Sequence, residues 1–170
     1  MAEITLGGKP TSIKGDMPRV GQTAPDITGV DMSMTERSLM DDYAGKVRVL
    51  IGIPSVNTSV CAMESRKFNE KLNGQSNAVG LIISKDLPFA MKNFCTAEGL
   101  ENIVMLSDFR YGDFCEEYGT EILNGNFKGL SARAVFVVDK KDTIRYVELV
   151  KEVGNEPNYD AIMEVVQSLV

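Results

Sequence analysis

Cys61 is the residue of this chain whose type and surroundings best suit covalent chemistry. It follows Pro54 and a short polar segment, where an apolar run gives way to a helical pattern. A cysteine in the first turn of a helix meets unpaired backbone N–H groups and the positive end of the helix dipole, and both favour the thiolate. A thiolate attacks a peroxide O–O bond and becomes a sulfenic acid. The alternative is a small core residue, since Cys61 shares its helical stripe with Phe68 and Leu72.

Two further cysteines, Cys95 and Cys115, complete the set, and none of the three stands at C-x-x-C spacing. Three cysteines do not make a disulfide scaffold, because an odd number leaves at least one of them unpaired. From its position alone, Cys95 is compatible both with redox catalysis and with packing as a buried helix cysteine. Cys115 lies beside Phe114 in a short predicted helix, so we interpret it as a packing residue.

The pattern of apolar residues predicts the elements that must hold these cysteines. Residues 47–53 are almost continuously apolar and suit a central strand covered on both faces. A helix is expected over 59–73, with Thr58 or Ser59 as its N-cap. A second helix is expected to begin after Asp86, its N-cap, and to end at Gly99, and Cys95 lies near its end. Further expected elements are a hairpin with strands at 4–6 and 11–13, strands at 27–30, 78–83, 103–106, 133–138 and 144–150, a polar loop at 41–46, and helices at 112–118 and 159–169.

The order of these elements predicts an α/β fold. Strands that alternate with helices form parallel pairs, whereas the short loop between the last two strands favours an antiparallel pair, so the sheet is mixed. This order fits a thioredoxin-like fold, in which a mixed central sheet is flanked by helices, here with an N-terminal β-hairpin. A length of 170 residues suits a single domain over 1–170.

Composition excludes several classes of function. The chain has no histidine, which rules out a His general base and removes the commonest metal ligand. With only three cysteines besides, we do not expect a structural zinc site. A formal charge of −6 without a basic cluster makes nucleic acid an unsuitable partner. No apolar stretch is long enough to cross a membrane and no secretory signal opens the sequence, so we expect a cytoplasmic protein.

The segment around Cys61 also resembles a known active-site motif. Pro54-x-x-x-Thr58-x-x-Cys61 is similar to the Pro-x-x-x-Thr-x-x-Cys motif of the peroxiredoxins, and the wider sequence resembles their thiol peroxidase (Tpx) subfamily. The resemblance covers nearly the whole chain. The further segments that match are Gly21-x-x-Ala24-Pro25-Asp26, Arg66-Lys67-Phe68-Asn69, Ser84-x-Asp86-Leu87-Pro88-Phe89-Ala90, Phe94-Cys95, Leu106-Ser107-Asp108-Phe109-Arg110 and Ala132-Arg133-Ala134-Val135-Phe136-Val137.

This resemblance implies a role for each of four residues. Cys61 would be the peroxidatic nucleophile, and Thr58 would hydrogen-bond the peroxide and align its O–O bond. Pro54 would shield the pocket from water. Arg133 would stabilise the thiolate and the charge that grows on the leaving oxygen. The alternatives are a helix cap for Thr58 and a surface ion pair for Arg133, although Arg133 opens an apolar strand.

Cys95 corresponds to the resolving cysteine of the subfamily. Its thiol would attack the Cys61 sulfenic acid and form an intrachain disulfide, as in an atypical two-cysteine peroxiredoxin. A disulfide tolerates only about 7 Å between Cα atoms, so we predict that both cysteine-bearing segments unwind locally during the cycle.

The resemblance also implies partners. The substrates would be hydrogen peroxide and alkyl hydroperoxides, the reductant would be thioredoxin, and the protein would form a homodimer without metal, haem or flavin. Asn57 departs from the pattern, since the subfamily usually has Asp there. It keeps the capping ability of Asp and loses its charge.

Two other functions remain compatible with the sequence. One is a thioredoxin-fold thiol–disulfide oxidoreductase or redox sensor, although the lack of C-x-x-C spacing disfavours general disulfide exchange. The other is a binding module without catalysis on the same fold, which would keep its function when Cys61 is lost.

Overall fold

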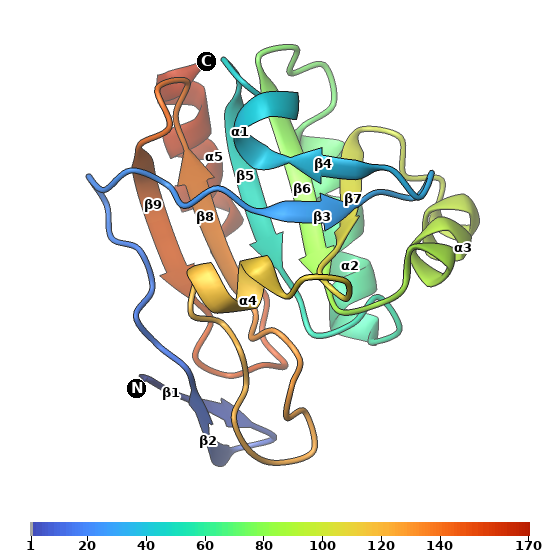
Figure 1. Cartoon of the computed structure of the whole chain (residues 1–170), viewed down its shortest axis with the longest axis vertical. Coiled ribbons are helices and arrows are strands. Elements are labelled where there is room, and N and C mark those ends of the chain that lie inside the picture. Colours follow the sequence, from blue (N-terminus) through green and yellow to red (C-terminus); the bar gives the residue numbers. More distant parts are fainter. Residues whose placement is uncertain (1) are drawn as a thin grey trace.

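A seven-stranded mixed sheet forms the centre of the protein (Figure 1). The computed structural model describes residues 2–170, so the first residue of the domain predicted over 1–170 lies outside the described residues. Along the sheet the strands stand in the order β4-β3-β7-β6-β5-β8-β9. The strands are β1 (Ala2–Leu6), β2 (Lys9–Ile13), β3 (Thr28–Val30), β4 (Glu36–Ser38), β5 (Val47–Gly52), β6 (Ala78–Ser84), β7 (Ile103–Ser107), β8 (Ala134–Val138) and β9 (Ile144–Leu149).

Helices cover both faces of this sheet. They are α1 (Leu39–Asp42), α2 (Ser59–Lys71), α3 (Pro88–Glu98), α4 (Asp113–Glu117) and α5 (Tyr159–Leu169). Helices α2, α3 and α5 pack on one face, where Cys61, Phe68 and Ile162 join one apolar core. Helices α1 and α4 pack on the other face in a second core around Phe136. Within residues 2–170, no helix is both long and apolar enough to cross a membrane.

Strand β5 is the central element, and every one of its residues is buried. It pairs in parallel with β6 and antiparallel with β8. Strands β8 and β9 form the antiparallel pair expected from their short loop. The predicted mixed sheet and thioredoxin-like fold are therefore confirmed.

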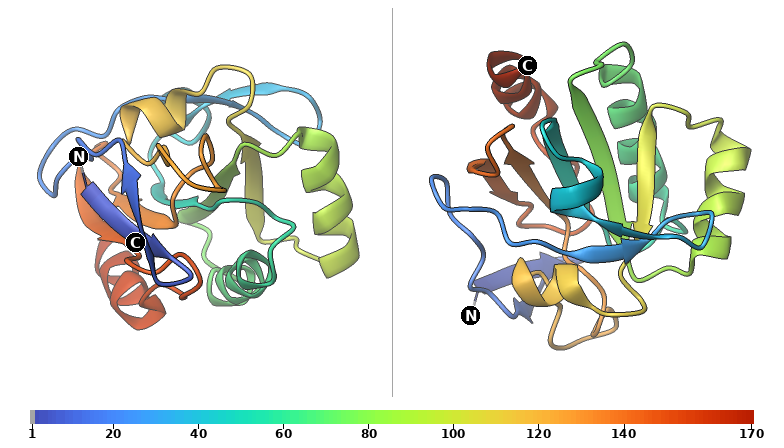
Figure 2. Two further views of the ribbon diagram at one scale, coloured as in Figure 1. Left: turned by 90° about the horizontal axis from the view of Figure 1, so that it is seen from below. Right: turned by 45° about the horizontal axis from the view of Figure 1, so that its top comes forward.

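The N-terminal hairpin lies apart from the sheet, beside the long loop that follows α4 (Figure 1, Figure 2). Strands β1 and β2 pair antiparallel across Gly7 and Gly8, which both have positive φ and so suit a tight turn. Ile4 and Ile13 anchor the hairpin in a third small core. The Glu152 carboxylate holds its tip by accepting hydrogen bonds from Gly8 N at 2.7 Å and from the Thr5 hydroxyl at 3.0 Å.

Three local expectations need correction. Asp41 and Asp42 belong to the short helix α1 rather than to a loop, because the Ser38 side chain caps that helix. Strand β4 was not expected from the sequence, and its three residues are held by pairing with β3. Asp86 does not cap α3, whose N-cap is Leu87. Its carboxylate faces the loop before α2 instead.

Candidate active site

The loop between β5 and α2 presents the candidate nucleophile. Thr58 has an extended backbone and caps α2, and its Oγ1 accepts a hydrogen bond from the Cys61 N–H at 3.3 Å. The same hydroxyl donates to the Ser55 carbonyl at 3.2 Å. Cys61 therefore stands in the first turn of α2, just past the carboxyl end of a central strand. Pro54, two residues after the end of that strand, is buried.

Arg133 reaches the sulfur of Cys61 from the neighbouring strand. Ala134 pairs with Gly52 in the β5–β8 register, so the residue before β8 lies beside the end of β5. The Arg133 Nη1 donates to Cys61 Sγ at 3.3 Å, and its Nε donates to the Val153 carbonyl at 2.9 Å. Both side chains are fully buried. This contact joins a fixed positive charge to a sulfur that also faces the positive end of a helix.

Glu64 completes the buried charges of the site. Its Oε2 lies 2.5 Å from Arg133 Nη1, and its other carboxylate oxygen has no hydrogen-bond partner among the described residues. Burial raises the pKa of Glu64 to about 7, although the positive charge of Arg133 acts in the opposite direction. Glu64 was not among the residues predicted from the sequence. The available signal was its position three residues after Cys61, on the same side of the helix.

A cavity of about 350 Å³ opens onto this site. Thr58 and Arg133 line the side of the cavity next to Cys61, which is itself fully buried, and Glu152 and Asn155 add polar groups elsewhere. The other walls come from three distant parts of the chain: the hairpin tip, the loop after α4 and the loop after β9. Their lining side chains include Leu6, Phe127, Glu152 and Val153. A small molecule in this cavity would therefore meet a hydroxyl and a guanidinium beside Cys61, apolar side chains, and the carboxylate of Glu152 and amide of Asn155.

Cys95 lies in the last turns of α3, on the same face of the sheet as Cys61. Both are free thiols, so the structure holds them in separate helices without a disulfide. Burial raises the pKa of Cys95 to about 11, which keeps its thiol protonated at neutral pH. The residue borders a second cavity of about 480 Å³ together with Met32 and Lys92.

Cys115 occupies a different place from the other two cysteines. It is buried in α4, which packs on the opposite face of the sheet from α2 and α3. Burial raises the pKa of its thiol to about 12. The interpretation of Cys115 as a packing residue agrees with this environment.

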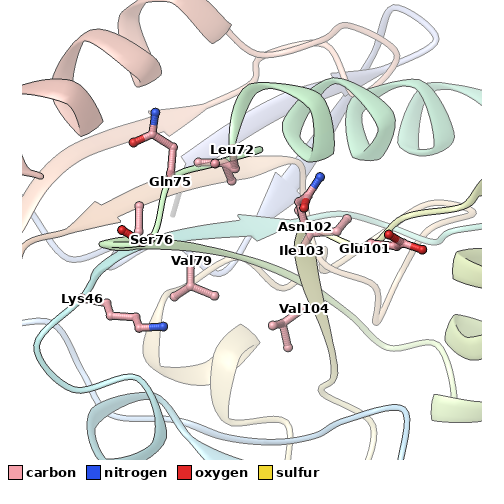
Figure 3. Close-up of a pocket in the computed structure, with 11 residues that line it drawn as sticks. Lys46, Leu72, Gln75, Ser76, Val79, Glu101, Asn102, Ile103 and Val104 are labelled. Atoms are coloured by element: carbon pink, nitrogen blue, oxygen red, sulfur yellow. The ribbon is translucent and has the colours of Figure 1, made fainter.

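A further pocket lies at the other end of the sheet (Figure 3). It measures about 390 Å³ and is bordered by the amino ends of β6 and β7, whereas Cys61 follows the carboxyl end of β5. Lys46 and Glu101 are its charged residues, and Gln75 and Asn102 add amide groups. This pocket is therefore remote from the cysteine site.

Comparisons with known proteins agree with this geometry. The family model described as Redoxin matches residues 19–163. The thiol peroxidase of Leptospira interrogans is 51% identical over 163 residues, which are 95% of each chain. The thiol peroxidase of Aquifex aeolicus is 40% identical over 167 residues, 98% of each chain.

Solved structures show the same fold. The crystal structure of a peroxiredoxin-like protein from Aquifex aeolicus superposes with a TM-score of 0.94 at 39% identity, covering 99% of this chain and 97% of that one. A thiol peroxidase from Chromobacterium violaceum superposes with a TM-score of 0.90 at 23% identity, covering 98% of this chain and 95% of that one. This second comparison shows that the two proteins share a fold.

Proposed function

Because the chain belongs to the Redoxin family and is a thiol-dependent peroxidase of the peroxiredoxin type, we propose that Cys61 is the residue that attacks the hydroperoxide. The observation that carries this proposal is the contact of 3.3 Å between Arg133 Nη1 and Cys61 Sγ in the first turn of α2. A guanidinium cannot be deprotonated in a protein, so a positive charge stays beside the sulfur at any working pH. The whole of residues 1–170 acts as one catalytic domain.

The first chemical step oxidises Cys61 by two electrons. Its thiolate forms an S–O bond with one peroxide oxygen while the O–O bond breaks, and the other oxygen leaves as alcohol or water after taking a proton. Arg133 stabilises the negative charge that moves from sulfur to the leaving oxygen. Thr58 hydrogen-bonds the peroxide in the cavity and aligns its O–O bond, and Pro54 limits the access of water.

The second step joins Cys61 to Cys95. The Cys95 sulfur attacks the sulfur of the Cys61 sulfenic acid, the S–O bond breaks, and the oxygen leaves as water. Both cysteines are buried in the reduced protein, and a thiol with a pKa of about 11 is a poor nucleophile at neutral pH. Local unwinding of both segments would expose the two buried sulfurs to each other. It would also return the Cys95 thiol to an ordinary pKa, because the thiol would no longer be buried.

The remaining partners follow from the same chemistry. Thioredoxin, a dithiol protein, reduces the intrachain disulfide to two thiols by thiol–disulfide exchange and is itself oxidised. The cytoplasm keeps such dithiols reduced, so the enzyme works in the cytoplasm. Besides hydrogen peroxide, the enzyme accepts alkyl hydroperoxides. The apolar walls around Leu6 and Phe127 suit the alkyl group of such a substrate.

We also propose that the enzyme is a homodimer that associates through an exposed apolar patch. Phe89 and Phe109 are each more than half exposed, and both border a hollow of about 340 Å³ together with Met34 and Leu87. Leu87, the N-cap of α3, is also exposed, at 45%. Exposed patches of this kind are typical of contacts between proteins, and a second copy of the chain is the occupant that the family resemblance favours.

Substitution of the cysteines tests the assignment. The Cys61→Ser variant should lose thioredoxin-dependent peroxide consumption, whereas Cys115→Ser, the matched control on the other face of the sheet, should retain it. The Cys95→Ser variant should react with one equivalent of peroxide, stop at the sulfenic acid and become overoxidised when more peroxide is added, which intact-mass measurement would reveal. Continued turnover by Cys61→Ser would overturn the proposal.

A further inference from the structure

The carboxylate of Asp86 binds the loop that carries Thr58. Its Oδ1 accepts a hydrogen bond from the Ser55 hydroxyl at 2.8 Å, and its Oδ2 accepts one from the Val56 N–H at 2.9 Å. The Oδ2 also accepts from the Ser84 hydroxyl at 2.6 Å. Hydrogen bonds to an ionised carboxylate are about twice as strong as neutral ones, so this side chain holds the loop firmly.

A continuous path of hydrogen bonds leads from Asp86 to Cys61. Ser55 donates its hydroxyl to Asp86, and its carbonyl accepts the Thr58 hydroxyl at 3.2 Å. Thr58 Oγ1 in turn accepts the Cys61 N–H at 3.3 Å. The orientation of the Thr58 hydroxyl and the first turn of α2 therefore depend on the position of Ser55, which Asp86 sets.

Asp86 is itself anchored to the sheet. Ser84 is the last residue of β6, and the Asp86 carbonyl accepts the hydroxyl of Ser107, the last residue of β7, at 2.6 Å. Asp86 also directly precedes Leu87, the N-cap of the helix that carries Cys95. One residue thus ties the loop before the Cys61 helix to the start of the Cys95 helix.

We propose that Asp86 is a positioning residue for the peroxide-reducing step, and that its hydrogen bonds to Ser55 and Val56 break before the disulfide forms. The inference rests on the proposed function of Cys61 and Cys95. While the bonds exist, Thr58 and Cys61 are held in the geometry that favours attack on the peroxide. Once they break, the loop and the first turn of α2 are free to move toward Cys95.

This assignment predicts opposite changes in the two chemical steps. In Asp86→Ala, oxidation of Cys61 by peroxide should slow by about tenfold, because the loop loses two charge-assisted hydrogen bonds. Disulfide formation, which does not depend on peroxide concentration, should accelerate by a similar factor. Overoxidation at high peroxide should therefore fall. A general loss of stability would not slow the first step while accelerating the second.

Two further variants keep the inference testable if Asp86→Ala fails to fold. Asp86→Asn keeps one acceptor and should give a smaller change of the same sign. Ser55→Ala breaks the path from the other side, and its effect on oxidation should not add to that of the Asp86 substitution in the double variant. Arg145→Met is the control, since it removes an ion pair outside both cysteine helices, the one with Asp139 at 3.2 Å.

The measurement is rapid acid quench followed by mass spectrometry, because the chain has no tryptophan to report the reaction by fluorescence. The expected result is the opposite change of the two rates in the Asp86 variants, with both rates unchanged in Arg145→Met. Wild-type rates in both steps for Asp86→Ala and Ser55→Ala, or a slowing of both steps together, would overturn the role of Asp86. Failure of Cys61 to oxidise in the wild-type protein would refute the proposed function instead.

Discussion

At the scale of single residues, Arg133 and Glu64 decide the charge around the candidate nucleophile. Two opposite charges are buried together beside a sulfur that can itself be negative. Arg133 therefore has two anions to compensate when both Glu64 and Cys61 are ionised. When Glu64 is protonated, it carries no charge, and the guanidinium compensates only the charge of the thiolate. The raised pKa of Glu64 favours this protonated form.

Removal of the guanidinium should slow the reaction of Cys61 with peroxide. We expect Arg133→Met to lower the second-order rate constant by on the order of 100-fold, because the charge on the leaving oxygen loses its main stabilising group. The measurement is competition for a limiting amount of hydrogen peroxide against a reference peroxidase. Arg145→Met, which removes an arginine that is half exposed on β9, is the matched control. Equal losses in both variants would contradict the role of Arg133.

Glu64 should make the stability of the reduced protein depend on pH. Below pH 4.5 the residue is protonated in both states; between pH 4.5 and about 7 the unfolded chain ionises while the folded protein stays protonated. The unfolded state then binds fewer protons, so the free energy of unfolding falls as pH rises through this window. Glu64→Gln lacks this contribution and should gain stability relative to the wild type as pH rises.

Urea unfolding of both proteins at several pH values across this window, followed by circular dichroism, checks the expectation. If the free energies of unfolding of the two proteins differ by the same amount at every pH, Glu64 ionises alike in the folded and unfolded chains, which would contradict the expectation.

At the scale of elements, the C-terminal end of α3 controls how easily Cys95 becomes available. The helix ends at Gly99, which has a φ of 67° in the left-handed region, and the Gly99 N–H donates to the Cys95 carbonyl. Glycine is the residue that adopts this conformation without strain. The terminal turn that holds Cys95 is therefore stabilised by a feature that one substitution can weaken.

Gly99→Ala should accelerate disulfide formation. No other heavy atom lies within 4 Å of the added Cβ, so the cost of about 1 kcal/mol comes from the backbone conformation alone. If the turn must open before Cys95 reacts, the step should become about fivefold faster. Quench-flow measurement of the peroxide-independent phase tests this.

Gly45→Ala provides the control, because Gly45 also has positive φ, at 74°, and an open space around its Cβ. It should lower stability to a similar degree and leave the disulfide-forming step unchanged. The same acceleration in both variants would show that α3 has no special part in resolution.

At the scale of the whole molecule, the exposed apolar patch should determine the oligomeric state. Substitution of Phe89 and Phe109 together by Ser should convert the proposed dimer to a monomer, since aromatic side chains supply much of the free energy of such contacts. Sedimentation velocity would give the mass of both proteins. Val20→Ser is the control, because Val20 is also well exposed but does not border the hollow lined by these residues. A double variant that remains dimeric would assign the contact to another surface.

Local sequence signals were sufficient to predict most of the elements. The helix at Tyr159–Leu169 and the start of α2 at Ser59 were predicted correctly, because apolar periodicity and a capping Thr58 are properties of neighbouring residues. The presence of Cys61 in the first turn of a helix followed from the same signals. Strand β4 was missed, since three residues with polar side chains have no pattern of their own and depend on pairing with β3.

Contacts between distant residues were decided by the tertiary structure. The sequence alone determined that a cysteine follows a central strand at the start of a helix. Only the antiparallel pairing of β5 with β8 brings Arg133 to that cysteine, and only packing on the sheet buries Glu64 beside it. Asp86 shows the same limit: its local sequence favours a helix cap, yet its carboxylate binds a loop 30 residues away. Capping depends on a few adjacent residues, whereas these contacts depend on how the whole sheet is ordered.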